Sequence, residues 1–276
     1  MICKKCGVKF SDGLFCPECG TRAIPVGVSE GAEQEEWDSI SESLAEEGYD
    51  TKKYGPQGQL EEQKVTGKDY LGAGSKRLFE SKILIFEQGI SIEENAVLEF
   101  RNCKLVIERE TAIWIKGKNV SIDFDNCYFE GEKGIVNKSG YDDIKLEFRN
   151  CALIYQVSTG TLVEACGTVY FENCFIKSPC ICELQPVDSF SMESKLEFRN
   201  CIVIEGNDRQ PYYSKRSLVY ASKAVVEFRN CFVRCSKRLV DWKRGYIGYK
   251  SGDIKVLIEN TYFDSNSYTV ERSPYV

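Results

Sequence analysis

Four cysteines near the amino terminus have the spacing of a zinc site. Cys3 and Cys6 form one CxxC pair, and after nine intervening residues Cys16 and Cys19 form a second. A two-residue spacer lets both thiolates of a pair turn toward one metal ion, and four sulfurs complete a closed tetrahedral Zn²⁺ site. Such a site leaves no position open for substrate, so we expect a structural zinc. The alternative is a pair of disulfides, which the missing secretion signal disfavours.

The two CxxCG knuckles resemble the short zinc ribbon domains found at the starts of many bacterial proteins. The resemblance covers residues 1–22 only. It implies a domain too small for its own core, which is unfolded without metal. Ribbons of this family mediate contacts with proteins or nucleic acids.

The catalytic chemistry open to this protein is limited because the 276-residue chain contains no histidine. This excludes Ser-His-Asp and Cys-His catalysis and every metal site that needs imidazole. Catalysis would have to use carboxylates, Lys, Arg, Tyr or Cys. The chain has no apolar run long enough to span a bilayer, and Met1 leads directly into charged sequence. We therefore expect a cytoplasmic protein with no membrane span and no signal peptide.

The net charge of −6 is concentrated in one segment near the amino terminus. Residues 23–67 carry eleven acidic and three basic residues, a balance of −8. We interpret residues 23–75 as an acidic linker that precedes a single domain at 76–276. Within the linker, Trp37, Ile40 and Leu44 form a narrow apolar stripe on a predicted helix at about 33–47. This helix either packs over an open end of the following domain or docks in the groove of a partner.

The domain at 76–276 is built from a repeated six-residue motif. The spacings between successive copies are 24, 24, 23, 27, 30 and 30 residues. Hydrophobic residues alternate within each copy, so the repeating unit is made of strands. The seven copies are LEFRNC (98–103), IDFDNC (122–127), LEFRNC (146–151), VYFENC (169–174), LEFRNC (196–201), VEFRNC (226–231) and VLIENT (256–261).

This pattern resembles the right-handed parallel β-helix, the solenoid of pectate lyases, polygalacturonases and phage tailspikes. The fold class implied is all-β, with about seven stacked coils. The first and third motif residues, such as Leu98 and Phe100, should point inward and stack from coil to coil, while the second and fourth face solvent.

Two further motif positions predict stacked columns at one corner of the solenoid. The asparagine column, Asn102 to Asn260, suits a left-handed bend and an inward-facing amide ladder. The next column, Cys103 to Cys231, should consist of free thiols packed as small apolar groups, because in-register Cβ atoms lie too far apart for disulfides.

Enzymes of this family bind saccharide along an outer groove, which directs attention to Glu164 and Glu183. Aligning the strand before each motif places these two glutamates at equivalent positions of consecutive coils, in one column with Asn137, Tyr220 and Asp241. Two carboxylates one strand apart would shift each other's pKa and could support acid-base chemistry. The alternative interpretation is a solvated sheet face.

A second candidate surface is basic. Between Arg209 and Arg244, ten basic residues face only two acidic ones, a local charge of +8 with aromatic residues interleaved. This composition suits a phosphate backbone, an acidic protein, or the acidic linker of the same chain. The residues of this basic patch that we single out are Lys215, Arg216, Arg234, Lys237, Arg238, Trp242, Lys243 and Arg244.

Together these features predict a non-catalytic, intracellular binding or scaffold protein. The zinc ribbon and the outer faces of the β-helix would be its contact surfaces, with another protein as the expected partner and nucleic acid or carbohydrate as alternatives. The second hypothesis is a carbohydrate-active enzyme or carbohydrate-binding protein that uses Glu164 and Glu183. A phage or virion component is the third.

Overall fold

The computed structural model of the chain describes residues 53–65, 69–107, 113–131, 134–137, 143–155, 161–184, 194–206, 217–221, 224–235, 238–242 and 254–264. The predicted zinc ribbon at 1–22 and the predicted helix at about 33–47 lie outside these residues. Every regular element in the described ranges is a β-strand. Across the same ranges, no helix is long and apolar enough to cross a membrane.

The strands form three parallel sheets that share the length of the domain. In order of pairing, the first sheet contains β1 (Glu61–Val65), β4 (Lys82–Phe86), β7 (Lys104–Ile107), β10 (Tyr128–Gly131), β13 (Ala152–Tyr155), β16 (Phe175–Ser178), β19 (Ile202–Glu205), β22 (Phe232–Arg234) and β25 (Tyr262–Asp264). The second contains β2 (Asp69–Leu71), β5 (Ile90–Ile92), β8 (Ile113–Ile115), β11 (Ile135–Asn137), β14 (Val163–Ala165), β17 (Cys182–Leu184), β20 (Ser217–Ala221) and β23 (Arg238–Trp242). The third contains β3 (Lys76–Glu80), β6 (Val97–Arg101), β9 (Ser121–Asp125), β12 (Ile144–Arg149), β15 (Gly167–Glu172), β18 (Ser194–Arg199), β21 (Ala224–Arg229) and β24 (Ile254–Glu259).

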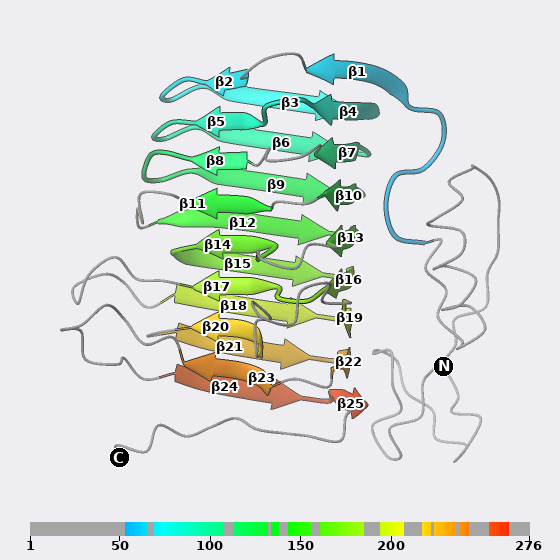
Figure 1. Cartoon of the computed structure of the whole chain (residues 1–276), viewed down its shortest axis with the longest axis vertical. Helices are drawn as coiled ribbons and strands as arrows, with labels where there is room; N and C mark the ends of the chain where they lie inside the picture. Colours follow the sequence, from blue (N-terminus) through cyan, green and yellow to red (C-terminus); the bar gives the residue numbers. More distant parts are fainter. Residues whose placement is uncertain are drawn as a thin grey trace.

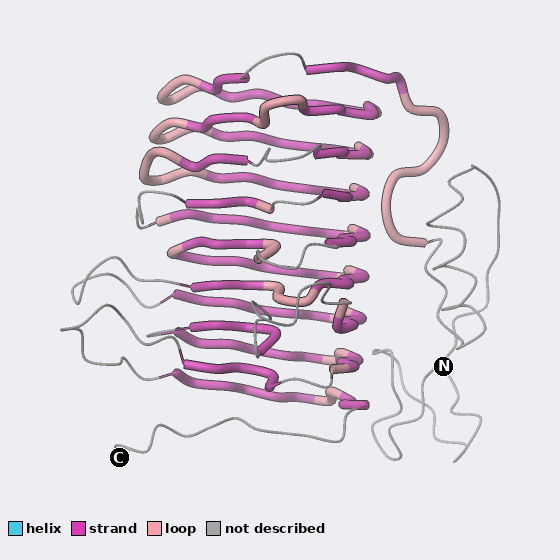
Figure 2. The backbone as a smooth tube through the Cα atoms, viewed as in Figure 1, coloured by secondary structure: helices cyan, strands magenta, loops and turns pink. Residues whose placement is uncertain are grey.

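Each sheet takes every third strand of the chain, and paired strands are parallel. The chain therefore visits the three sheets in turn and returns one strand spacing further along, as the stacked arrows of Figure 1 show. In Figure 2 the strands lie in layers that turn at short loops. The predicted parallel β-solenoid is confirmed.

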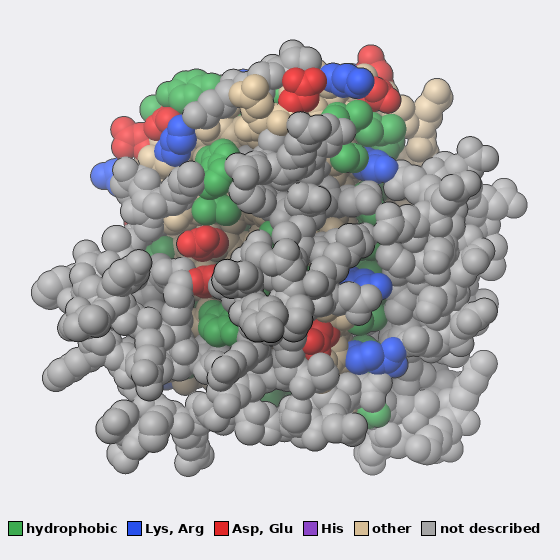
Figure 3. Space-filling view, viewed as in Figure 1, with side chains coloured by type: hydrophobic (Ala, Val, Ile, Leu, Met, Phe, Trp, Pro, Cys, Tyr) green, Lys and Arg blue, Asp and Glu red, His purple; other side chains and the backbone are tan. Residues whose placement is uncertain are grey.

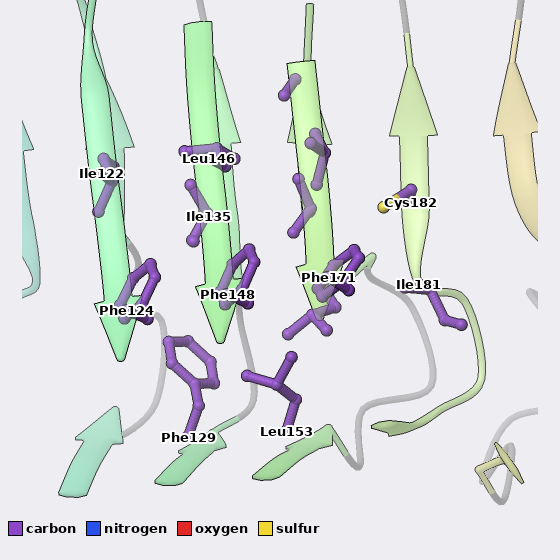
Figure 4. Close-up of a cluster of buried hydrophobic side chains, with 14 of the residues drawn as sticks. Ile122, Phe124, Phe129, Ile135, Leu146, Phe148, Leu153, Phe171, Ile181 and Cys182 are labelled. Carbon is purple, nitrogen blue, oxygen red and sulfur yellow. The ribbon is translucent and has the colours of Figure 1, made fainter. Parts of the chain in front are cut away.

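The core is filled by the inward residues of the motif. Phe100 to Phe228 stack coil over coil, and the structure adds Phe79 at the start of the row. Neighbouring ring centroids in this row lie 4.7–5.4 Å apart with planes within 13°. Figure 4 shows Phe124, Phe148 and Phe171 in a row on neighbouring strands. Each fully buried ring contributes about 1.5–3 kcal/mol by leaving water.

The motif asparagines form the corner between the β3–β24 sheet and the β1–β25 sheet. All seven adopt the left-handed conformation, with φ between +46° and +55°. The expected inward orientation is wrong, because these side chains are half-buried or exposed. The amides bond along the outside of the corner, from Asn126 Nδ2 to Asn102 Oδ1 at 3.2 Å and from Asn173 Nδ2 to Asn150 Oδ1 at 3.4 Å. The bend therefore requires asparagine mainly for its backbone conformation.

The cysteine column occupies the inside of the same corner. All ten described cysteines are free and buried, including the six of the motif. Each motif thiol lies 3.0–3.3 Å from the carbonyl oxygen two residues earlier and 3.3–3.4 Å from a phenylalanine carbonyl oxygen of an earlier coil. The thiols thus provide the inward hydrogen bonds that we had expected from asparagine. Burial raises the pKa of Cys127 and Cys151 well above its ordinary value.

The structure differs from the predicted architecture in three details. Strands β1 and β2 belong to the solenoid although they lie in the predicted linker, because the solvent-exposed end strand β1 has no hydrophobic alternation to reveal it. Ile258, expected inside, is 49% exposed because it lies on the last strand of its sheet. The count of about seven coils is not confirmed, since the described strands form sheets of nine, eight and eight strands.

Candidate functional site

Several predicted site residues lie outside the described ranges. They are the four predicted zinc ligands, Cys3, Cys6, Cys16 and Cys19, and five residues of the basic patch, Lys215, Arg216, Lys237, Lys243 and Arg244. Among the residues that are described, no three His, Cys, Asp or Glu side chains gather as a metal site.

The two candidate catalytic glutamates lie side by side as the alignment predicted. Glu164 on β14 is the direct partner of Glu183 on β17, and the column continues through Tyr220 to Asp241. Asn137 does not belong to this column, because Val136 pairs with Glu164. The error was a slip of one residue: Asn137 is a polar residue at an inward, buried position, so hydrophobicity alone misassigns its face.

Access to this pair is unequal. Glu164 is half-buried, whereas Glu183 is only 5% exposed. The Thr161 hydroxyl lies 3.4 Å from Glu183 Oε2 as a hydrogen-bond donor. Carboxylates one strand apart have about the separation that retaining glycosidases use. However, a polysaccharide could reach Glu183 only if the atoms that bury it moved away.

The described part of the basic patch does not lie on one sheet. Arg234 is on β22 of the β1–β25 sheet, and its guanidinium lies 5.6 Å from the Phe232 ring centroid. Arg238 and Trp242 are the first and last residues of β23, in the β2–β23 sheet. A corner of the solenoid therefore separates Arg234 from the other two, which local charge along the sequence could not show.

The outward face of the β3–β24 sheet carries the most ordered set of charges among the described residues, and we call it the charged face. Its centre is an acidic row with one carboxylate on each strand from β6 to β21 except β15, which carries Tyr170; Leu78 on β3 and Leu257 on β24 lie at the two ends of the row. The rows follow from strand register, which aligns equivalent motif positions. The members of the acidic row are Glu99, Asp123, Glu147, Glu197 and Glu227.

Basic side chains flank the acidic row on both sides. We name them the lysine row (Lys76, Lys145 and Lys195) and the arginine row (Arg101, Arg149, Arg199 and Arg229); Asp125 and Glu172 interrupt the arginine row.

Ion pairs connect the three rows within and between strands. Arg149 contacts both carboxylate oxygens of Asp123, at 2.9 and 3.0 Å, and Glu147 Oε2 at 2.7 Å. Lys195 contacts Glu197 at 3.0 Å and reaches Glu227 on the next strand at 3.7 Å. The charges are therefore held as a network rather than as isolated pairs.

The network sets the ionisation of the acidic row. Burial alone would raise the pKa of Glu147 and Glu197, but the lysine and arginine beside each carboxylate outweigh burial and lower its pKa. The hydrogen bond from Lys76 lowers the pKa of Glu99. Burial raises the pKa of Asp123 despite its contact with Arg149. Burial, with nearby Glu172, also raises the pKa of Tyr170 to about 12.

Sequence reasoning had interpreted these outward residues as an ordinary solvated face. The available signal was the lysine immediately before two LEFRNC copies, Lys145 and Lys195, combined with Glu and Arg inside each copy. Charged side chains of both signs also gather near β1–β4, at one end of the solenoid (Figure 3). There Arg77 pairs with Asp69, and Lys82 with Glu61.

Comparisons with known proteins identify the family of the solenoid. Comparison with curated proteins found no match, and comparison with solved structures found none either. A family model described as "right handed beta helix region" matches residues 72–263, which include most of the strands described above. The chain therefore belongs to the right-handed β-helix family.

Proposed function

We propose that this chain is a non-catalytic binding or scaffold protein, and that the charged face holds a protein partner. The observation that carries the proposal is the layering of charge on that face. The four glutamates of the acidic row, Glu99, Glu147, Glu197 and Glu227, are 8–17% exposed, and Asp123 is 37% exposed. The lysine row above them is 43–64% exposed. A partner would therefore meet cations first.

This layering supports binding rather than catalysis. Glu99, Glu147 and Glu197, whose pKa is lowered, stay ionised near neutral pH and cannot donate a proton as a general acid. Lysine heads two or three strands apart and arginine heads one or two strands apart, held by strand register, form a preorganised array for the carboxylates of an acidic protein surface. The outward face of a parallel sheet of eight strands suits a macromolecular partner better than a small substrate.

The predicted zinc ribbon and cellular location complete the proposal. We infer that Cys3, Cys6, Cys16 and Cys19 hold a structural Zn²⁺, and that residues 1–22 form a second contact point. The cytoplasm remains the proposed location. It is supported by the ten free, buried cysteines in the described ranges, which suit a reducing compartment.

A capture experiment with matched charge loss tests the proposed surface. The full chain with Lys76→Gln, Lys145→Gln and Lys195→Gln is compared with a chain that carries Lys64→Gln, Lys116→Gln and Lys118→Gln outside the charged face. We expect proteins retained by the parent chain at low salt to be lost from the first variant and kept by the second. If both variants capture these proteins equally and circular dichroism shows both to be folded, the charged face is not the binding surface.

A carbohydrate-active or carbohydrate-binding role is the second candidate, favoured by one observation. Glu164 and Glu183 are in register on neighbouring strands, with Tyr220 next in the column. If this role is correct, Glu164→Gln and Glu183→Gln should each abolish turnover or binding in a screen of acidic and neutral polysaccharides. Activity that depends on either glutamate would replace the first proposal.

A further inference from the structure

The outward face of the β1–β25 sheet is apolar over five consecutive strands. Its side chains form a hydrophobic cluster separate from the solenoid core. Residues of this outer cluster alternate along each strand with core residues: Phe175 and Ile202 point outward, while Ile176 and Val203 point into the core. The sheet members of the outer cluster are Tyr128, Ala152, Ile154, Phe175, Ile202, Ile204 and Phe232.

These outward side chains are nevertheless shielded from water. Phe175 and Ile202 are 0% exposed, and Phe232 is 5% exposed. A side chain on the outside of a sheet loses its solvent contact only where other atoms lie over it. Among the described residues, Tyr54 is the one member of the outer cluster that does not come from the sheet. Its ring centroid lies 6.3 Å from that of Phe175.

The segment from Tyr54 to Glu61, the first residue of β1, follows this face from strand to strand. Glu61 pairs with Lys82 on β4, and Gln57 exchanges two hydrogen bonds with Asn102, which precedes β7, at 2.7 and 2.9 Å. The Gly55 amide donates to the Asn150 carbonyl, before β13, at 3.0 Å. Figure 1 shows this segment beside β4, β7, β10 and β13.

Gly55 fits this path because of its backbone conformation and the space beside it. Its φ of +93° disfavours any residue with a side chain. A Cβ built there would lie 3.5 Å from Tyr128 Cβ and 3.8 Å from Ala152 Cβ, which is ordinary contact distance. The segment therefore lies directly on the outer cluster. From Glu61 to Tyr54 it crosses from β4 to β16, about 19 Å at the usual strand spacing.

We propose that residues 33–47 continue along this path as a helix and cover the outer cluster over β19 and β22. The apolar stripe of Trp37, Ile40 and Leu44 would pack on Ile202, Ile204 and Phe232. An α-helix rises about 1.5 Å per residue, so the stripe spans about 10 Å, or two strand spacings. That length is enough to cover β19 and β22, which are neighbouring strands one spacing apart.

Connectivity and charge favour this occupant over a separate molecule. The segment ends a few residues before Tyr54, which already lies on the cluster, so its effective concentration at the face is high. Residues 33–47 carry seven acidic and no basic side chains. The outward side chains on the same sheet include Lys177 on β16 and Arg234 on β22, which lie on strands beside the proposed helix.

Site-specific photocrosslinking in the full chain tests the proposal. A photoreactive phenylalanine analogue is placed at Ile40, and in a matched control at Ser39, which lies away from the apolar stripe of the helix. We expect Ile40 crosslinks to peptides that contain β19 or β22, within one molecule when isotopically light and heavy copies are mixed. Crosslinks between copies would assign the face to a second molecule and overturn the proposal, as would crosslinks to any other part of the chain.

A substitution pair gives an independent readout. Ile40→Asp should uncover the outer cluster, raise the fluorescence of a bound hydrophobic dye and remove hydrogen-exchange protection from residues 33–47. Ser39→Asp adds the same charge and should leave both signals unchanged. If Ile40→Asp also leaves both unchanged while the β-sheet circular dichroism spectrum persists, residues 33–47 do not cover this face. The inference is independent of the proposed partner of the charged face.

Discussion

The corner asparagines give the sharpest test of how the motif specifies the fold. Asn150 has φ of +54°, and its exposed amide donates to Asp125 Oδ1 at 3.2 Å. An alanine in the left-handed region costs about 1–2 kcal/mol, whereas glycine carries no such penalty. Asn150→Ala and Asn150→Gly both lose the amide bond. The difference between them is the strain of alanine, about 1–2 kcal/mol, less the extra chain entropy that glycine loses on folding, about 0.5–1 kcal/mol. We therefore expect Asn150→Gly to be more stable than Asn150→Ala by about 1 kcal/mol.

Urea unfolding with a constant slope measures this difference through the midpoint. Thr168 in β15 supplies the control, because it lies inside a regular strand where glycine costs more than alanine. The order of the two substitutions should therefore be reversed at Thr168. If Asn150→Ala proved as stable as Asn150→Gly, the left-handed conformation would not penalise alanine at this corner and the reasoning about the backbone would be wrong.

Three further predictions concern the metal, the thiols and acid stability. The parent chain should bind one equivalent of zinc, and the Cys3→Ser, Cys6→Ser double variant should bind none. A full equivalent of zinc in the variant would contradict the assignment of these cysteines as ligands. The ten described cysteines should resist alkylation until the protein unfolds, because buried thiols are poor nucleophiles; native disulfides detected by mass spectrometry would contradict this. Glu147 has its pKa lowered in the folded state, so its contribution to stability is present above its ordinary pKa of 4.5 and lost as pH falls through the folded pKa. Glu147→Gln should therefore lose less stability than the parent chain on acidification, and parallel stability curves would refute this.

The solenoid core could be predicted from the sequence because inward and outward residues alternate strictly along each copy of the motif. Leu98 and Phe100 point inward as expected, and both are completely buried. The same period placed Glu164 beside Glu183. It failed at Asn137, where a polar residue points inward, and at β1, where all but the last of the residues of the strand are exposed.

Features that depend on neighbouring coils could not be predicted from one repeat. Lys195 and Glu227 are far apart in the sequence, and only the register of β18 with β21 brings them into contact. The burial of Ile202 on an outer face is another example, since the hydrophobic pattern of β19 does not show which segment covers it. The orientation of the asparagines was misjudged because cysteine, the next residue in the motif, occupies the inside of the corner.

Photocrosslinking from the charged face inside cells tests the proposed function most directly. Thr168 is exposed and lies between Lys145 and Lys195 in strand register, so a photoreactive residue there samples the space above the charged face. A matched residue at Lys118, outside that face, is the control. The binding proposal predicts a discrete protein adduct from Thr168 that is absent from Lys118 and lost when Lys145 and Lys195 are changed to Gln. The absence of any protein adduct at Thr168, or the same adducts from both positions, would contradict it.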